Sequence, residues 1–411
     1  MRIGIFTDTY APHINGVATS ILMLENALRK QGHSVFIVTV NPDELSYDFE
    51  NSDRIIRIPG IPTGIYDYRL SGIYPVKAVN KIKEWNLDII HSHTEFGIGT
   101  FARIMAKQLD IPIVHTYHTM YEDYVHYITR GHFDSTSKKI VEYFTKFYCD
   151  KTVTELIVPT KKTYDLFKEK YKYNRNVHII PTGIEVERFY KENIDYKKVS
   201  SLKDKYNIKS DDFVILFVGR IAKEKSIDFL IDNHASLVRK NKKCKLLIVG
   251  GGPDLEDLKK KARKLGDNVI FTDKVPWNDV PNYYHLASLF ATASHTETQG
   301  LTVIEAMSAG LPVVALDDDA FNTVIKEDID GYLFKDKKKY KNSIEKLMGD
   351  KEHCKKLGAQ ALINSNQYSA KYYAEKVLDV YNLALKGRNT SEKRGFFRRA
   401  KDIFKRGFHE K

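Results

Sequence analysis

Short runs of apolar residues recur along the chain, and the longer stretches between them place apolar residues every three or four positions. Runs of four to seven apolar residues are typical of strands buried in a parallel sheet. In the first half they predict strands at 2–7, 35–40, 55–58, 88–91, 112–116, 151–154 and 177–180. The helical period predicts helices between most of these strands, at 17–30, 75–85, 97–109, 137–148 and 161–170.

The alternation begins again after a charged stretch, 187–210, which we interpret as a linker with a short helix. Strands are predicted at 213–218, 245–249, 269–271, 289–291 and 312–315. One helix is predicted near 226–239, a second between the strand at 245–249 and residue 265, and a third near 280–286. Beyond 337 the pattern is helical, near 337–348, 351–365 and 370–386. We therefore predict an α/β chain with two Rossmann-like βα domains, 1–184 and 185–369. A helix at 370–388, expected to return to the first domain, and a tail at 389–411 complete the organisation.

Composition agrees with two domains and favours anionic partners. The 411 residues carry a formal charge of +12, which suits nucleotides, nucleic acid or an acidic membrane surface. Cys149, Cys244 and Cys354 lack metal-site spacing and are interpreted as reduced thiols of a cytosolic protein. The apolar start is too short for a signal peptide, and no run approaches the roughly 20 residues of a membrane span. We expect a soluble or peripheral protein.

The tail at 391–411 combines aromatic and basic residues at helical spacing. Its apolar positions are Phe396, Phe397, Ala400, Ile403, Phe404 and Phe408, and its basic positions include Lys393, Arg394, Arg398, Arg399, Lys401, Lys405 and Arg406. This pattern predicts a helix lying in an anionic membrane surface. The alternatives are a solvated tail and a nucleic-acid arm. We favour the membrane, and expect no nucleic acid partner, because nucleic acid does not need four phenylalanines on one face.

A polar loop at 292–300 leads directly into a predicted helix that begins near Leu301. The N-terminus of a helix suits an anionic phosphate, and Gly300 allows a ligand close to the backbone. Glu297 precedes the helix and Glu305 lies one turn inside it. The two carboxylates are suited to hold the hydroxyls of a sugar and a ribose. The alternative is an exposed helix start with two solvated glutamates.

Further candidates lie in loops that follow predicted strands, where doubly wound domains bind their ligands. Arg220 and Lys225 are five positions apart and suited to neutralise a diphosphate, although a surface pair beside Glu224 is an alternative. Gly16 marks the first strand-to-helix turn, and the missing G-x-G-x-x-G pattern argues against an NAD or FAD enzyme. His118 follows a buried strand and is expected at its carboxyl end, although a structural histidine is an alternative.

A metal site must also be considered, because three further histidines lie close by in the sequence: His91, His93 and His115. Alternating strand positions need not converge on one point, and no carboxylate is spaced to complete a site. We therefore expect no metal ion.

Glu297 and Glu305 with seven residues between them, together with Gly-Arg-x-x-x-Glu-Lys at 219–225, resemble the retaining glycosyltransferases of family 4. That family has the GT-B fold, in which two Rossmann-like domains face a central cleft. The resemblance implies that Glu305 binds the ribose, Glu297 and His118 contact the donor sugar, and Gly16 lets the phosphates approach. It also implies roles for Arg220 and Lys225 at the diphosphate, for the backbone of Thr298, Gln299, Gly300 and Leu301 at the sugar and distal phosphate, and for Lys274 and Val275 beside the base.

Within the family, residues 116–128 resemble the bacterial diacylglycerol glucosyltransferases. This resemblance implies a UDP-glucose donor, a diacylglycerol acceptor and an α-monoglucosyl lipid product, made at the cytoplasmic face of the cell membrane. His118, Glu297, Arg220 and Lys225 are the catalytic candidates, and no metal cofactor is expected because the two cations occupy the place of Mg²⁺. The alternatives are transfer to a soluble or polymeric acceptor such as a teichoic acid, sugar or protein, a sugar-nucleotide epimerase, and a membrane binder without activity.

Overall fold

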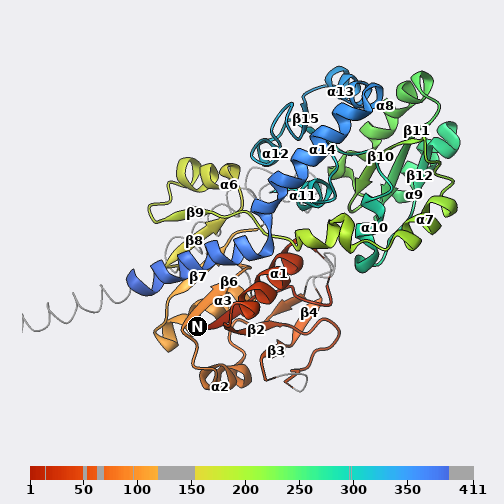
Figure 1. The fold of residues 1–411 in the computed structure, drawn as a ribbon. Coiled ribbons are helices and arrows are strands. Elements are labelled where there is room, and N and C mark those ends of the chain that lie inside the picture. The colour runs from red at the N-terminus through yellow and green to blue at the C-terminus, as the bar shows by residue number, and fades with distance from the viewer. Residues whose placement is uncertain are drawn as a thin grey trace, which may run out of the picture. The chain divides into compact units, whose positions relative to one another are not determined.

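The computed structural model describes residues 1–13, 15–49, 53–62, 69–95, 97–118, 153–295, 297 and 299–387. The chain forms two compact units (Figure 1). Unit 1 contains residues 1–159 and 163–180 and the chain from 373 onward, and unit 2 contains 160–162 and 181–372. Each unit is built around its own parallel sheet.

The sheet of unit 1 has seven parallel strands in the order β3-β2-β1-β6-β7-β8-β9. They are β1 Arg2–Phe6, β2 Ser34–Val40, β3 Ile55–Ile58, β6 Ile89–Ser92, β7 Ile113–Thr116, β8 Glu155–Val158 and β9 Val177–Ile179. Its helices include α1 Gly16–Lys30, α2 Val76–Glu84, α3 Gly97–Leu109 and α6 Lys161–Asp165, which continues into a π-helical turn, Leu166–Lys170. The strand order reverses between β1 and β6, and this is where doubly wound folds bind ligands.

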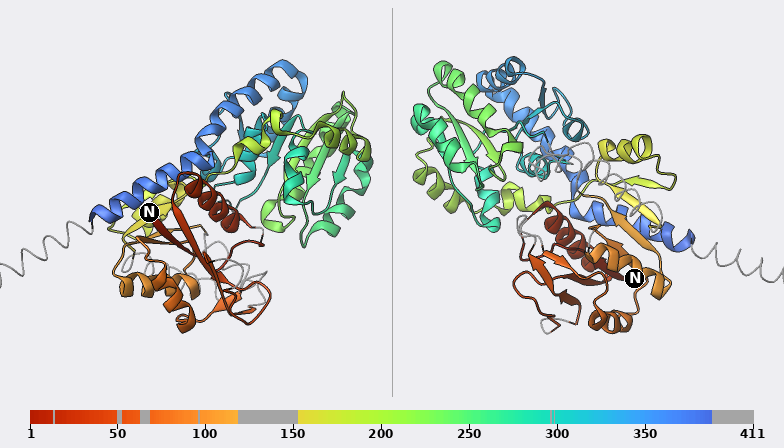
Figure 2. Two further views of the ribbon diagram at one scale, coloured as in Figure 1. Left: turned by 60° about the horizontal axis from the view of Figure 1, so that its bottom comes forward. Right: turned by 180° about the vertical axis from the view of Figure 1, so that it is seen from behind.

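Helices cover both faces of this sheet. On one face, Phe6, Phe36 and Val38 pack against buried residues of α2 and α3 such as Ile82 and Phe101. On the other face, α1 and the C-terminal helix, residues 370–387, lie side by side (Figures 1 and 2). Burial on both faces is why these strands are nearly continuous apolar runs.

Unit 2 repeats this architecture with six parallel strands in the order β12-β11-β10-β13-β14-β15, so its order reverses between β10 and β13. The strands are β10 Phe213–Val218, β11 Cys244–Val249, β12 Val269–Phe271, β13 Leu289–Thr292, β14 Val313–Leu316 and β15 Gly331–Phe334. The helices are α7 Tyr196–Lys205, α8 Ile227–Lys240, α9 Leu255–Ala262, α10 Val280–Tyr284, α11 Leu301–Ser308, α12 Asp319–Asn322, α13 Lys337–Gly349 and α14 Lys351–Ser365.

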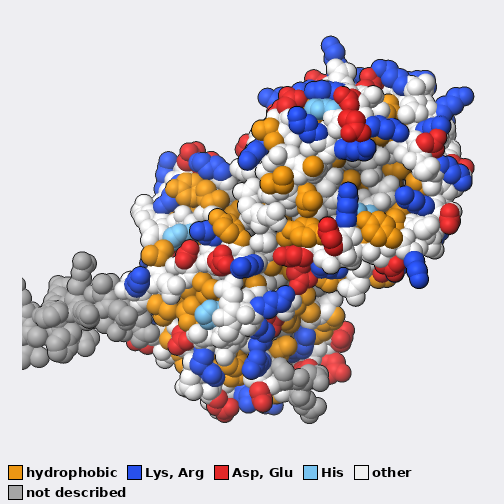
Figure 3. Space-filling model, in the orientation of Figure 1, with side chains coloured by type: hydrophobic (Ala, Val, Ile, Leu, Met, Phe, Trp, Pro, Cys, Tyr) orange, Lys and Arg blue, Asp and Glu red, His pale blue; other side chains and the backbone are white. Residues whose placement is uncertain are grey.

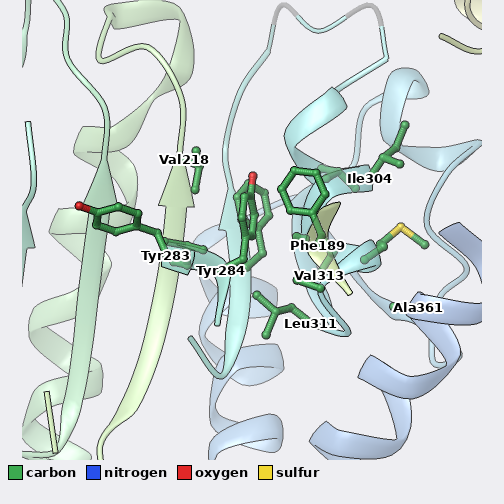
Figure 4. Close-up of a cluster of buried hydrophobic side chains, with 14 of the residues drawn as sticks. Phe189, Val218, Tyr283, Tyr284, Ile304, Leu311, Val313 and Ala361 are labelled. Carbon is green, nitrogen blue, oxygen red and sulfur yellow. The ribbon is translucent and has the colours of Figure 1, made fainter. Parts of the chain in front are cut away.

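Alternate residues of the unit 2 strands enter two separate cores. Val218 and Val313 face a cluster built from α10, α11 and the 3-10 helix Val186–Phe189 (Figure 4). In that cluster the rings of Phe189 and Tyr284 meet edge to face, with centroids 5.4 Å apart. The intervening residues, such as Ile215, face α8, α9 and α13. This packing fixes the two strand ends, β10 and β13, that carry the predicted donor loops.

Most predicted elements are confirmed, and three strands at 55–58, 213–218 and 269–271 match residue for residue. The predicted strand at 151–154 is wrong for its two described residues, 153 and 154, which do not lie in a strand. The strand is β8, four residues later, where each residue from Glu155 to Val158 is buried. Strand β15 and the antiparallel pair β4 Gly60–Pro62 and β5 Arg69–Ser71 were not predicted, because β4 and β5 contain no apolar run and β15 lies within a highly charged stretch. The helix predicted at 137–148 lies outside the described residues.

The surface of the described residues mixes both signs of charge. Lys and Arg side chains are interspersed with Asp and Glu over the face in Figure 3. That face therefore lacks the continuous basic stripe that is typical of nucleic-acid-binding domains. Within the described ranges, no helix is both long enough and apolar enough to cross a bilayer.

Candidate active site

The loops after β10 and β13 meet in unit 2, where the strand order reverses. Lys225 Nζ donates to Glu297 Oε1 and forms an ion pair with it. Ser294 Oγ donates to the same carboxylate oxygen at 3.0 Å. Both side chains of the ion pair are about one-fifth exposed. The fold thus joins two predicted site residues that are 72 positions apart in the sequence.

Arg220 is held by a carboxylate of its own loop. Its Nη2 donates to Oε1 of Glu224, whose side chain is buried while that of Arg220 is one-third exposed. In the sequence analysis, a surface ion pair with Glu224 was the alternative to a role at the diphosphate. The pair exists, but because Glu224 is buried it fixes the guanidinium at the end of β10.

A glycine loop after β11 supports the Arg220 loop from behind. A Cβ on Gly250 would lie 1.9 Å from the carbonyl oxygen of Gly219, and one on Gly252 would lie 2.1 Å from that of Ile221. The backbone N–H of Ile221 also donates to Gly251 O at 2.9 Å. Only glycine allows this approach, so the loop contributes by packing.

Gly300 sets the start of α11. Its φ is +74°, and a Cβ there would lie 2.5 Å from the ring of Phe321, so both conformation and space require glycine. The side chain of Gln299 makes two hydrogen bonds with the backbone of Thr182, at 2.6 and 2.9 Å. These bonds hold the side chain of Gln299 against Thr182, and the backbone contact with the donor that the resemblance implies stays a prediction. Leu301 begins the helix, and Thr298 lies outside the described residues.

Glu305 lies inside α11, and its side chain is partly exposed. Burial raises the pKa of its carboxyl to about 7, although a hydrogen bond from Tyr284 (2.6 Å) and the positive charge of Arg188 oppose the rise. The guanidinium carbon of Arg188 lies 3.3 Å from the centroid of the Trp277 ring. Sequence reasoning missed Arg188, because it falls in the stretch interpreted as a linker.

Lys274 and Val275 lie beside the glycine loop of unit 2. A Cβ on Gly251 would meet that of Lys274 at 3.3 Å. Lys274 is exposed, whereas Val275 packs against the buried cluster of α10 and α11. This places both residues next to the loop that supports Arg220.

Gly16 and His118 belong to unit 1. Gly16 is the first residue of α1, after the N-cap Asn15, whose side chain accepts from Ala18 N at 2.9 Å. A Cβ on Gly16 would meet nothing within 4 Å, so packing does not require glycine at this position. The open space is compatible with the close approach of a ligand.

His118 follows β7, and its Nε2 lies 2.8 Å from Nδ1 of His93. Burial lowers the pKa of His118 to about 4. His91 bonds with Tyr381 and Thr116, and His115 bonds with Ser92 and Glu95. The histidines thus use protein partners, and no cluster of metal-ligating side chains occurs in the described part of the chain. Metal independence stays a prediction.

The structure therefore places Arg220, Lys225, Lys274, Val275, Glu297, Gly300, Leu301 and Glu305 around one end of the unit 2 sheet. The predicted membrane residues, Arg394, Phe396, Phe397, Arg398, Arg399, Ile403, Phe404, Lys405, Arg406 and Phe408, lie outside the described residues.

Two family models match the chain in succession. "Glycosyltransferase Family 4" matches residues 14–188, and "Glycosyl transferases group 1" matches residues 199–362. Among solved structures, that of Anabaena Alr3699/HepE in complex with UDP-glucose superposes with a TM-score of 0.69 at 16% identity, covering 92% of this chain and 99% of that one. The predicted GT-B fold, with its two Rossmann-like domains, is confirmed by such neighbours.

Closer relatives are two proteins named alpha-monoglucosyldiacylglycerol synthase. The one from Streptococcus pneumoniae is 39% identical over 81% of this chain and 75% of its own length. The one from Acholeplasma laidlawii is 36% identical over 93% of this chain and 96% of its own length. With this identity and coverage, and with both family models matched in order, the chain is a glycosyltransferase that belongs to family 4.

Proposed function

We propose that the protein is a retaining α-glucosyltransferase that moves glucose from UDP-glucose to the free hydroxyl of diacylglycerol, giving α-monoglucosyldiacylglycerol for glycolipid and lipoteichoic-acid anchor synthesis. The observation that carries this proposal is the 36–39% identity to synthases of that lipid, extending over at least 75% of their length. Arg220 and Lys225 also support it. They lie in the loop after β10, where the strand order of unit 2 reverses, and a departing UDP needs positive charge nearby to stabilise it.

The ion pairs suggest how the donor binds. Glu297 forms an ion pair with Lys225, and Glu224 forms one with Arg220. A diphosphate carries more negative charge than one carboxylate, so it would compete with Glu297 for Lys225. Glu297 would then be released to accept hydrogen bonds from hydroxyls of the glucose. In this way, binding of the diphosphate is coupled to binding of the glucose.

The reaction itself would proceed by front-face attack. The acceptor oxygen forms its bond to the anomeric carbon on the side from which UDP leaves, and retains the α configuration. The hydroxyl proton passes to the departing diphosphate oxygen. Arg220, Lys225 and the N-terminus of α11 stabilise the negative charge that develops there. Because these groups occupy the place of a divalent cation, we propose that no metal is required.

A lipid acceptor requires contact with a membrane, and we propose a peripheral location at its cytoplasmic face. Unit 1 exposes several large apolar side chains within a short stretch of sequence. Ile61 and Leu70 are cross-strand partners of β4 and β5, with 68% and 52% of their surfaces exposed. Ile73 and Val76 follow, at 60% and 66%. Exposed apolar side chains grouped in this way favour an apolar partner, and the basic tail adds the attraction to anionic lipid.

The test is incubation of the protein with labelled UDP-glucose and vesicles of anionic phospholipid and diacylglycerol. We expect label in an organic-soluble glycolipid and one free UDP for each glucose transferred, with activity that survives EDTA. Label in a water-soluble product would favour a soluble or polymeric acceptor. Conversion of the donor without release of UDP would indicate an epimerase, and activity restored only by Mg²⁺ would contradict metal independence.

A further inference from the structure

His118 has a buried neighbour that sequence reasoning considered only as a metal ligand. Strands β6 and β7 are adjacent, and each ends one or two residues before one member of a histidine pair. The backbone N–H of His93 donates to Phe6 O at 2.9 Å, which fixes His93 against β1. Its Nδ1 lies 2.8 Å from His118 Nε2, and the ring planes are inclined by only 19°. The two rings therefore share one hydrogen bond.

Both rings are neutral near pH 7. Burial lowers the pKa of His93 well below 6.5, and the neighbouring His91, His118 and His115 would repel a positive charge there. Burial likewise lowers the pKa of His118 to about 4, although Glu95 acts in the opposite direction. A neutral imidazole carries one proton on one of its two nitrogens. One proton therefore lies between His93 Nδ1 and His118 Nε2, and one ring must be its donor.

The second ring nitrogen of His93, Nε2, decides whether His93 or His118 donates the shared proton. His93 Nε2 is buried and has no hydrogen-bond partner in the described part of the chain. If His118 were the donor, His93 would carry its own proton on Nε2, as a buried N–H with no acceptor. A buried N–H without an acceptor loses its hydrogen bonds to water and gains none in return, and such N–H groups are rare in proteins. If His93 is the donor, its Nε2 is a bare lone pair.

We propose that His93 is a positioning residue that donates its Nδ1 proton to His118 Nε2 and so keeps the proton of His118 on Nδ1. This step rests on the proposed function and on the contact between His118 and the donor sugar that the family resemblance implies. The tautomer then makes His118 a hydrogen-bond donor to an oxygen of the transferred hexose. His118 then has no basic nitrogen facing the sugar. The acceptor proton goes to the leaving diphosphate, and His118 serves binding and orientation.

The first test reads the tautomer directly in the wild-type protein without substrate. Two-bond ¹⁵N–¹H correlation spectra of protein labelled at histidine distinguish Nδ1–H from Nε2–H rings. His234 and His285 are internal standards, because each donates from Nε2 to a backbone carbonyl, Asn268 O at 3.0 Å and Phe189 O at 2.7 Å. The signals of the pair are assigned from His118→Asn and His93→Asn spectra. We expect both rings to carry the proton on Nδ1, opposite to the standards. A proton on His118 Nε2, or a cationic ring at neutral pH, would overturn the proposal.

The second test is kinetic. Asparagine at position 93 places an N–H donor near the position of Nδ1, whereas leucine removes it. We expect His93→Leu to raise KM for UDP-glucose about tenfold, as for one lost hydrogen bond, with a smaller change in kcat, and His93→Asn to restore most of the affinity. His234→Leu removes a buried histidine of unit 2 and controls for lost stability. Equal KM values for His93→Leu and His93→Asn would contradict the positioning role. If wild type transfers no glucose, the proposed function fails, while the spectra still decide the tautomer.

Discussion

At the scale of single residues, the donor end of unit 2 keeps its cations in contact with carboxylates. Lys225 is paired with Glu297 and Arg220 with Glu224, so neither side chain needs to be ordered anew when a diphosphate arrives. Ordering a long cationic side chain costs up to about 2 kcal/mol. The ion pairs therefore lower the entropic cost of donor binding. They also mean that the diphosphate must replace a glutamate carboxylate as the partner of the cation.

Replacement of Lys225 tests this arrangement. We expect Lys225→Met to lower kcat/KM for UDP-glucose by about 10²–10³-fold, since it removes one preorganised contact to the developing negative charge and leaves Glu297 without its cation. Steady-state assays measure the change. Lys223→Met is the matched control, because Lys223 lies in the same loop and is exposed. Near-equal activity of the two variants would show that Lys225 has no such role.

Glu305 gives a prediction about pH. Burial raises its pKa from 4.5 to about 7. Between these values the folded chain holds a proton that the unfolded chain has released, so the free energy of unfolding falls as pH rises through this window. The shift corresponds to roughly 3 kcal/mol. We expect Glu305→Gln to lose this part of the pH dependence and to be the more stable protein above about pH 7. Urea unfolding of both proteins on either side of the window measures it, and parallel pH profiles would refute it.

At the scale of elements, the loops after β10 and β11 act as one unit because their backbones touch. Gly250 has a φ of +140° and lies against Gly219. We expect Gly250→Ala to destabilise unit 2 by about 1–3 kcal/mol, the usual cost of overpacking, and to weaken UDP binding by displacing the Arg220 loop. Thermal unfolding and calorimetric titration with UDP measure the two effects.

Gly349→Ala is the control for that substitution. Gly349 ends α13, is exposed, and a Cβ there would meet nothing within 4 Å. This control should keep both stability and UDP affinity near the wild-type values. Wild-type UDP affinity in Gly250→Ala would show that the Arg220 loop keeps its position without the glycine contact.

The element pattern was largely predictable from the sequence, whereas the site was predictable only in part. Apolar runs such as 213–218 were found because burial on both faces leaves few polar positions in such a strand. Strand β15 was missed because charged residues lie on both sides of its short apolar segment. The contact between Lys225 and Glu297 depends on β10 and β13 being neighbours, and local patterns carry no information on strand order. Arg188 was missed because it lies in the stretch interpreted as a linker, and its contact with Trp277 joins residues 89 positions apart.

At the scale of the whole molecule, the end of the chain completes the first unit. The helix at 370–387 buries Ala374, Val377 and Tyr381 in unit 1. Tyr381 OH lies 2.7 Å from His91 Nδ1, and Tyr373 OH lies 3.4 Å from Ser20 Oγ of α1. His91 is fully buried, so removal of the helix would expose it together with one apolar face of the sheet. Unit 1 therefore depends on residues that follow unit 2 in the sequence.

Two truncations separate this structural role from the membrane role predicted for the tail. A chain ending at 369 loses the helix, and we expect aggregation or a melting temperature many degrees lower, because several fully buried side chains lose their partners.

A chain ending at 387 keeps the helix, so it should melt like wild type and bind UDP equally well. It lacks the basic aromatic residues 393–408, and each basic residue near an anionic leaflet contributes about 1 kcal/mol. We therefore expect it to lose most of its flotation with anionic vesicles and most of its glycolipid synthesis. Unchanged flotation of the chain ending at 387 would assign membrane binding to the exposed apolar residues around β4 and β5 instead.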